Sequence, residues 1–201
     1  MRALSLLTAC LAAAVLASSP AYARKGLVET IVGEFGNTTT TVAGTGNIEV
    51  GFSPDEGAEK LVLKVIGSAQ REIRILSYSF TSAPVVRALL DARHRGVDVA
   101  LIADYKANVS EDRSGKARHA LAALVNAGCR VRTISVYAIH HDKTIIVDGR
   151  TVETGSFNFS DAAAHKNSEN ALVMWNNQEL AAVYLKHWQS RFSQGQDFTA
   201  Y

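Results

Sequence analysis

The sequence predicts an α/β fold, in the form of an α-β-α sandwich around a mixed, mostly parallel sheet. Short runs rich in Ile, Val, Leu and Tyr alternate along the chain with longer amphipathic runs, and Gly or Pro residues separate them. Strands that alternate with helices of about 10–15 residues are typical of βαβ units, which build parallel sheets. The chain has 201 residues, of which 47% are hydrophobic and 20% charged, so it can bury the sizeable core of one such domain.

The expected elements follow one another through most of the chain. The first helix starts near Pro54 with two acidic residues in its first turn, a pattern typical of helix N-termini. Asp148 and Gly149 are typical of a tight hairpin turn between two strands. Strands are expected at 47–52, 71–80, 97–103, 129–136, 139–147, 151–155 and 170–175. Helices are expected at 55–67, 83–95, 114–127 and 177–193.

The N-terminus has the three parts of an export signal. Arg2 supplies a basic start, residues 3–17 form a short apolar core, and an Ala-Tyr-Ala sequence offers a cleavage site. We therefore expect residues 1–23 to be a signal peptide and the mature chain to be periplasmic or secreted. The alternative, a lipoprotein processing site at Cys10, conflicts with the apolar residues that follow it. Cleavage would leave Cys129 as the single cysteine, so no intramolecular disulfide is expected.

The rest of the chain divides into a short lead-in and one domain. Residues 24–46 are rich in Thr and Gly and lack apolar periodicity, so we assign them no chemistry. Residues 47–201 are expected to form a single domain. The net charge of +2 is nearly balanced, which excludes an argument for nucleic-acid binding from overall charge. Any affinity for anions must therefore come from local clusters of residues.

One stretch in the C-terminal half carries the residues expected to do chemistry. If residues 139–147 form a strand, His141 and Lys143 lie together on one face and apolar residues follow them. A cation on a mostly apolar strand loses hydration, and an anionic ligand is the natural way to offset that loss. Ser156 and Asn158 share one face of a following extended segment, so both could contact the same anion.

These positions fit a known signature. Every fixed position of the pattern His-x-Lys-x4-Asp-x6-Gly-Ser-x-Asn is occupied, by His141, Lys143, Asp148, Gly155, Ser156 and Asn158. At these residues the chain resembles the phospholipase D superfamily, and Glu169 resembles the glutamate usually found downstream. Because the motif occurs once in a short chain, the resemblance points to the small single-motif bacterial periplasmic endonucleases. It implies a phospholipase D-like catalytic domain at 47–201, with the sandwich fold already expected from the elements.

The residue types and the resemblance together suggest a role for each side chain. His141 is the expected nucleophile, with a core histidine as the alternative. Lys143 is expected to bind phosphate, unless its ammonium extends to the edge of the sheet. Ser156 and Asn158 are expected to bind the same phosphate, with loop capping as their alternative. Asp148 is undecided between a catalytic residue and a plain turn residue.

Glu169 completes the expected catalytic set. It is predicted to hydrogen-bond the second ring nitrogen of His141 and fix its tautomer, although a solvated strand charge is the alternative. His140 should face the other side of the strand and be structural. The remaining histidines are His94, His119, His165 and His187. They are not spaced as metal ligands are and have no acidic cluster beside them, so no metal and no cofactor are expected.

A mechanism follows from these types. A phosphodiester is anionic and resists attack, so its oxygens must be neutralised before a nucleophile can reach phosphorus. We expect Lys143 and Asn158 to do this while His141 forms a covalent phosphohistidine, which water then hydrolyses. The single motif supplies no evident acid for the departing oxygen. The resemblance implies that two motifs face each other, so we expect a homodimer with the active site at its two-fold interface.

Three functions are compatible with these residues. The leading hypothesis is a metal-independent, sequence-nonspecific endonuclease that hydrolyses DNA, with RNA as a further substrate. The alternative is a phospholipase D-type hydrolase acting on phospholipid head groups, because the motif recognises the phosphate and not what is attached to it. The third is a silent phosphate-binding module, which would not need a nucleophile. Basic residues that could contact phosphates are Arg93, His94, Arg95, Lys116, Arg118, His119, Arg130 and Arg132.

Overall fold

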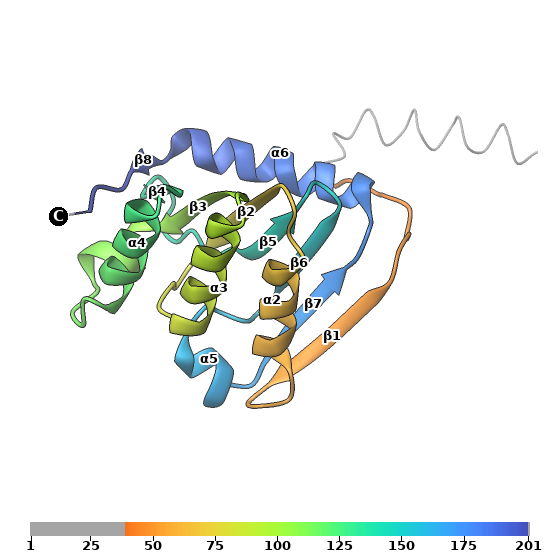
Figure 1. Cartoon of the computed structure of the whole chain (residues 1–201), viewed down its shortest axis with the longest axis horizontal. Helices are drawn as coiled ribbons and strands as arrows, with labels where there is room; N and C mark the ends of the chain where they lie inside the picture. Colours follow the sequence, from red (N-terminus) through yellow and green to blue (C-terminus); the bar gives the residue numbers. More distant parts are fainter. Residues whose placement is uncertain (1–38, 201) are drawn as a thin grey trace, which may run out of the picture. The chain divides into compact units, whose positions relative to one another are not determined.

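The computed structural model describes residues 39–200, so the predicted signal peptide and most of the predicted lead-in lie outside the described residues. An eight-stranded sheet has the strand order β1-β7-β6-β5-β2-β3-β4-β8 (Figure 1). The strands are β1 (Ile48–Ser53), β2 (Glu72–Ser77), β3 (Asp98–Asp104), β4 (Arg130–Ile134), β5 (Lys143–Val147), β6 (Thr151–Gly155), β7 (Glu169–Met174) and β8 (Gln196–Asp197). The helices are α2 (Ala58–Gly67), α3 (Ala83–His94), α4 (Lys116–Asn126), α5 (Asp161–His165) and α6 (Gln178–Gln194), with a short π-helix, η1, at Lys106–Ser110.

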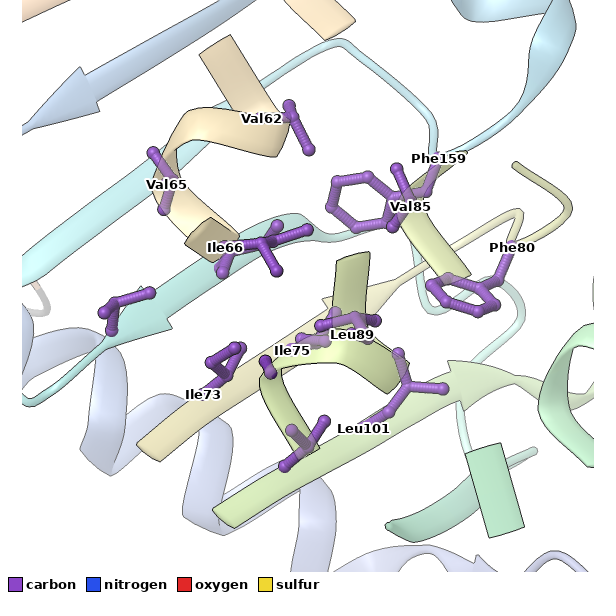
Figure 2. Packing of buried hydrophobic residues seen from close by; sticks show 14 of the residues in the cluster. Val62, Val65, Ile66, Ile73, Ile75, Phe80, Val85, Leu89, Leu101 and Phe159 are labelled. Carbon is purple, nitrogen blue, oxygen red and sulfur yellow. The ribbon is translucent and has the colours of Figure 1, made fainter. Parts of the chain in front are cut away.

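Helices cover both faces of the sheet, which confirms the predicted α-β-α sandwich. Helices α2, α3 and α4 lie on one face, and α6 runs across the other (Figure 1). On the first face, Ile73 and Ile75 of β2 and Leu101 of β3 belong to the larger core (Figure 2). Val65 of α2 and Leu89 of α3 pack into the same core. This core fixes the central strands that lead to the motif.

The second face has a smaller core beneath α6. Leu76 of β2 and Ile146 of β5 point to this face, opposite to their sequence neighbours in the larger core. Trp188 of α6 covers them, and its Nε1 donates a hydrogen bond of 3.1 Å to the carbonyl oxygen of Ile75. Burial on both faces explains why these strands are continuously apolar in the sequence.

The sheet is mixed, but the prediction that it is mostly parallel is wrong. Among the described strands, the pairs β2–β3 and β3–β4 are parallel and the other five pairs are antiparallel. The alternation of strands and helices that indicates parallel pairing ends at β4. Asp148 and Gly149, with φ angles of 53° and 65°, form the predicted hairpin turn between β5 and β6. A turn this short joins only antiparallel strands.

Two strand ends differ from the prediction in a way that matters for the site. The motif strand begins at Lys143, four residues later than expected, so His141 lies in the loop before β5. The strand expected to run to residue 80 ends at Ser77, and Tyr78 follows it outside the strand. Both differences leave side chains in short loops at the same edge of the sheet. The short elements α5, η1 and β8 were not predicted, because they are too brief to show periodicity.

Candidate active site

The motif residues other than Asp148 gather at one edge of the sheet, where β2 and β6 end and β5 and β7 begin. Because β5 is antiparallel to β2 and β6, its N-terminal end lies beside the C-terminal ends of both neighbours. Lys143 pairs with Ser77, the last residue of β2. Gly155, the last residue of β6, pairs with Ala171 near the start of β7. The topology thus brings the loop that carries His141 close to the residues that follow β6.

The ammonium of Lys143 occupies a largely buried position. Lys143 is 6% exposed, and its Nζ donates a hydrogen bond of 2.7 Å to the carbonyl oxygen of His141. The ammonium also lies 5.1 Å from the ring centre of Tyr78. Burial lowers the pKa of Lys143 from its usual value, and the charges of Asp142 and Glu169 oppose that shift. The site therefore holds a desolvated cation that an anionic ligand would stabilise.

The imidazole of His141 lies at the surface beside this cation. Its ring packs against the ring of Tyr78, with the ring centres 4.6 Å apart and the planes at 55°. Neither ring nitrogen has a hydrogen-bond partner among residues 39–200, so both are open to a substrate. The prediction that His141 shares a strand face with Lys143 is wrong in detail, because His141 precedes β5. The two side chains nevertheless meet at Tyr78.

Polar contacts fix the loop on both sides of His141. The backbone N–H of His140 donates to Asp104 Oδ2, at the end of β3, over 2.8 Å. Asp142 Oδ2 lies 3.3 Å from His140 Nδ1 and 3.3 Å from Nε2 of His187 in α6. His140 is 2% exposed, and burial is the main cause that lowers its pKa, as suits a neutral structural residue. The flanking residues are thus anchored while the ring between them stays free.

The Gly-Ser-x-Asn segment follows β6 and forms the other side of the site. Ser156 Oγ accepts hydrogen bonds from the backbone N and the Nδ2 of Asn170, at 3.1 and 3.4 Å. A Cβ at Gly155 would lie 2.2 Å from the carbonyl oxygen of Asn170, so only glycine permits this close approach. Asn158 Oδ1 is buried and has no hydrogen-bond partner among the residues described. The protein engages Ser156 itself, whereas Asn158 Nδ2 makes no hydrogen bond within residues 39–200, so this donor is available for an anionic ligand.

The structure does not show the predicted contact between Glu169 and His141. Glu169 is the first residue of β7, and its Oε1 accepts a hydrogen bond of 2.9 Å from Asn167 Nδ2. Within residues 39–200, no hydrogen bond joins it to the imidazole. Burial lowers the pKa of Lys143, and the charges of Asp142 and Glu169 act against that effect. The influence of Glu169 in this structure is therefore on the ammonium.

Asp148 lies at the opposite end of β5 from Lys143. Its Oδ1 accepts hydrogen bonds from the backbone N of Arg71 at 2.8 Å and of Glu72 at 3.0 Å. Its Oδ2 accepts another from the backbone N of Gln70 at 3.0 Å. Burial raises the pKa of Asp148, but these backbone hydrogen bonds outweigh burial and hold the pKa below its usual value. The structure does not bring this carboxylate to the exposed imidazole, so the geometry favours a turn residue over a catalytic one.

The fold and the motif geometry agree with known protein families. The family model described as "Cardiolipin synthase, PLD-like domain" matches residues 62–192, which contain every motif position. The chain belongs to the phospholipase D superfamily. This confirms the family predicted from the motif. The domain has the fold and the motif of a phosphodiesterase of that superfamily.

Solved structures and curated relatives agree with this membership. The phospholipase D family member Nuc from Salmonella typhimurium is 47% identical, with a TM-score of 0.72 over 76% of this chain and 97% of that one. NucT from Helicobacter pylori is 24% identical, with a TM-score of 0.67 over 76% and 99%, which shows the fold alone. A phospholipase D of Rickettsia bellii is 36% identical over 140 residues, 70% of this chain and 66% of that protein. The match thus spans about two thirds of that relative's length.

Two residues of the site were not singled out from the sequence. Tyr78 lies within the expected strand 71–80, where an aromatic residue is most simply explained by core packing, so it gave no separate signal. His187 lies in an amphipathic helix far along the chain, and only the fold brings it to Asp142. Both belong to the phospholipase D-like domain but lie outside its sequence motif.

The described part of the domain offers neither a metal site nor a membrane span. Within residues 39–200, no group of three His, Cys, Asp or Glu side chains is placed to hold a metal ion. No helix in that range is long and apolar enough to cross a membrane. The metal independence expected from the sequence stays a prediction, which chelation can test.

Proposed function

We propose that the chain is a metal-independent phosphodiesterase, and specifically an endonuclease that cuts DNA without sequence preference and accepts RNA as well. One observation carries this proposal: an exposed, unpaired imidazole lies beside a buried ammonium, and both contact Tyr78. This pair offers a nucleophile next to a cation that can neutralise phosphate oxygens. A module that only bound phosphate would need the ammonium but not the free imidazole.

The first step is an in-line attack of a ring nitrogen of His141 on phosphorus. A P–N bond forms, the bond from phosphorus to the departing oxygen breaks, and that oxygen takes a proton from a general acid. Lys143 Nζ and the amide of Asn158 hold the non-bridging oxygens, where negative charge develops. In the second step water attacks phosphorus, its proton passes to the same acid-base group, and the P–N bond breaks. The imidazole is then restored.

The general acid is proposed to come from a second copy of the chain. Within residues 39–200, His140 is buried and His187 lies against Asp142, so neither is free to act as this acid. A homodimer with its two-fold axis at the site would supply a second His141. Exposed apolar residues beside an incomplete site suit an interface between copies. Three large exposed residues of the loop before the motif are Val136, Tyr137 and Ile139.

A groove of about 770 Å³ beside the site supports a polymeric substrate. It lies between α3 and α4 and is lined at one end by Ser82, whose backbone N–H donates to the carbonyl oxygen of Phe159 at 2.8 Å. Phe159 directly follows Asn158, so the groove begins close to the phosphate-binding segment. Arg87 and Lys116 also line the groove, and neither has an ion-pair partner among the described residues. The lining also carries two carboxylates, Glu59 and Asp161. These cations could contact phosphates of a strand that extends beyond the scissile bond.

Other basic residues noted in the sequence are less suited to this task. Arg130 pairs with Asp98 and Arg132 with Asp197, each at 2.7 Å. Their charges are therefore already matched by carboxylates. The basic residues that end α3 lie at the opposite end of that helix from Ser82. Lys116 and its neighbours at the start of α4 are thus the members of this set that lie nearest the groove.

A phospholipid substrate is the second candidate, and the floor of the same groove gives the observation in its favour. The lining includes the aliphatic residues Val86, Leu90, Ala120 and Ala123, and no Phe, Tyr or Trp on which a base could stack. An acyl chain would fit such a floor, and the Rickettsia bellii relative carries the name phospholipase D. Nucleic acid is preferred because two unpaired cations along a groove suit the repeated phosphates of a strand.

The place of action is proposed to be the periplasm or the medium. The support is the signal-peptide pattern of residues 1–23, which lie outside the described part of the chain. Cell fractionation tests this: mature protein that begins at Arg24 is expected outside the cytoplasm. Uncleaved protein retained inside the cell would contradict it.

The proposal is tested by incubating purified mature protein with plasmid DNA and, separately, with phosphatidylcholine or cardiolipin vesicles, all in excess EDTA. Nicking that survives EDTA and is lost in His141→Asn supports the endonuclease. The matched control is His94→Asn, an exposed histidine at the far end of α3, which is expected to keep full activity. Lipid hydrolysis without nicking would favour the second candidate, and a strict need for a divalent ion would contradict both.

The dimer is tested separately, by sedimentation at the assay concentration. A dimer is expected, and mixtures of wild-type and His141→Asn chains should form heterodimers with altered turnover. A fully active monomer would contradict the proposed source of the acid.

A further inference from the structure

We propose that Tyr78 is a positioning residue of this site, whose ring holds the imidazole of His141 next to the ammonium of Lys143. The ring stabilises that ammonium and, in the copy of the chain that supplies the general acid, the imidazolium of His141. The ring centre lies 4.6 Å from that of His141 and 5.1 Å from Lys143 Nζ. Within residues 39–200, no other aromatic ring contacts either side chain. The expected effect of Tyr78 on turnover rests on the proposed function. The contacts of its ring with His141 and Lys143 are present without a substrate and do not depend on that function.

The position of Tyr78 is set by buried hydrogen bonds rather than by a free loop. Asn108 is 0% exposed, and its Nδ2 donates to the carbonyl oxygens of Tyr78 at 2.5 Å and of Asp104 at 2.8 Å. Its Oδ1 accepts a hydrogen bond of 2.9 Å from the backbone N of Phe80. The carboxylate of Asp104 also holds the backbone N–H of His140. The ring and the loop that carries the nucleophile are thus tied to the same end of β3.

An aromatic ring suits this place better than a carboxylate would. A ring attracts a cation through its quadrupole within about 6 Å and carries no net charge. A carboxylate at the same position would stabilise Lys143 too, but it would repel the phosphate that the ammonium is proposed to bind. The ring therefore offsets part of the desolvation of Lys143 and leaves its remaining N–H donors for an anionic ligand.

The carboxylates around the site are engaged with groups other than the imidazole of His141. Asp142 contacts the flanking histidines, His140 and His187, through the same Oδ2. Glu169, from β7, acts on Lys143 and makes no hydrogen bond to the imidazole within residues 39–200. The Tyr78 ring is the group in contact with the imidazole, and a ring in this position would stabilise the imidazolium in the copy of the chain that supplies the general acid.

The first test needs no substrate. The titration of His141 is followed by proton NMR in the wild type, in Tyr78→Phe, which keeps a ring, and in Tyr78→Leu, which does not. The pKa of His141 is expected to fall by about half a unit in Tyr78→Leu and to stay unchanged in Tyr78→Phe, because removal of the ring removes stabilisation of the cation. An unchanged pKa in Tyr78→Leu, or an equal fall in both variants, would overturn the inference.

The second test measures turnover of a small phosphodiester against pH. The basic limb of the kcat profile is expected to move to lower pH in Tyr78→Leu, with kcat reduced about tenfold at the wild-type optimum. Tyr78→Phe should match the wild type within about threefold. Tyr184→Leu, a partly buried tyrosine of α6 outside the site, is the matched control and should leave the profile in place. A Tyr78→Leu profile identical to the wild type would contradict the positioning role.

A third variant covers the case in which Tyr78→Leu fails to fold. Fluorinated phenylalanines at position 78 keep the shape of the ring and weaken its quadrupole, so the pKa of His141 should fall stepwise with fluorine number. No trend would overturn the inference. If NMR shows the expected shifts but no variant hydrolyses a phosphodiester, the proposed function fails while the role of Tyr78 stands.

Discussion

The two ends of β5 carry charged residues of one motif, but the protein treats them differently. At the N-terminal end, Lys143 donates a single hydrogen bond to a backbone carbonyl, and the neighbouring ring of His141 has no hydrogen-bond partner among the residues described. At the C-terminal end, Asp148 accepts hydrogen bonds from three consecutive backbone N–H groups. A charged group whose hydrogen bonds are all made within the protein stabilises the fold. A charged group with hydrogen-bonding capacity left over is available to bind a ligand. The spacing of the motif does not distinguish the two.

The largest effect is expected from Lys143→Met. The variant loses the cation proposed to neutralise the phosphate oxygens, so kcat/KM for DNA should fall by about 10²–10³-fold. Its free energy of unfolding should be unchanged or higher, because methionine fills similar space without a buried charge. Initial rates and urea unfolding measure the two quantities.

The matched control for this change is Lys64→Met. Lys64 pairs with Glu49 at the surface, where its side chain is 58% exposed, so both activity and stability should stay close to the wild type. A Lys143→Met enzyme with wild-type turnover would contradict the ligand-binding role assigned to the N-terminal end of β5.

A third ionisable group, on the neighbouring strand β6, is also left without hydrogen bonds in the described part of the chain but lies away from the site. Glu153 is 0% exposed and lies between Ile145 and Val173 in the sheet register. Neither of its carboxylate oxygens has a hydrogen-bond partner among the described residues, and burial raises its pKa to about 8. Unlike Lys143, it faces the main core and no ligand can reach it. It should therefore be a cost to stability without a role in the site.

The sign of this cost depends on pH. Because the pKa of Glu153 is higher in the folded than in the unfolded chain, the full stability is present at low pH and is lost as pH rises from about 4.5 through about 8. Glu153→Gln should equal the wild type near pH 4 and exceed its free energy of unfolding near pH 9 by on the order of a few kcal/mol. Urea unfolding at both pH values measures this, and parallel curves for the two proteins would contradict it.

A smaller effect on stability is expected from Asp148→Asn. The amide cannot accept the three backbone hydrogen bonds as well as the carboxylate, so the free energy of unfolding should fall by about 1–3 kcal/mol. Because the pKa of Asp148 is lowered in the folded state, this stabilisation is present above the usual carboxyl pKa and lost as pH falls through the lowered value. The difference between the two proteins should therefore shrink in acid.

The activity of Asp148→Asn decides its assignment. Turnover per folded molecule should stay within a few fold of the wild type, since the side chain lies a whole strand away from the imidazole. A variant with wild-type stability and no activity would reverse the roles given to the two ends of β5.

Much of the site could be predicted from the sequence, because its residues lie in one contiguous motif. The pattern around Lys143 predicted a buried cation, and the structure shows one. The sequence could not decide the role of Asp148, since that depends on backbone N–H groups from β2, far away in the chain. It also gave no sign of Tyr78 or His187, which join the site only through the sheet order and the docking of α6.

The fold could be predicted to the level of its layers. Helix and strand periodicity located the long elements, and the hairpin at Asp148 and Gly149 was clear from turn residues. Strand direction was not accessible in the same way, because alternation of helices and strands indicates parallel pairing and says nothing of where it stops. The loop that places His141 before β5 also depends on its anchors, the buried Asp104 and the partly exposed His187, which no local pattern reveals.

The central claim is that the free imidazole at the open end of β5 becomes covalently bonded to phosphorus. The most direct measurement is rapid acid-free quenching of the protein during turnover of a labelled phosphodiester, followed by mapping of the label by mass spectrometry. A phosphoramidate on His141 is expected to form and decay within the catalytic cycle and to be absent from His141→Asn. Turnover without any such adduct, or a label on another residue, would contradict it.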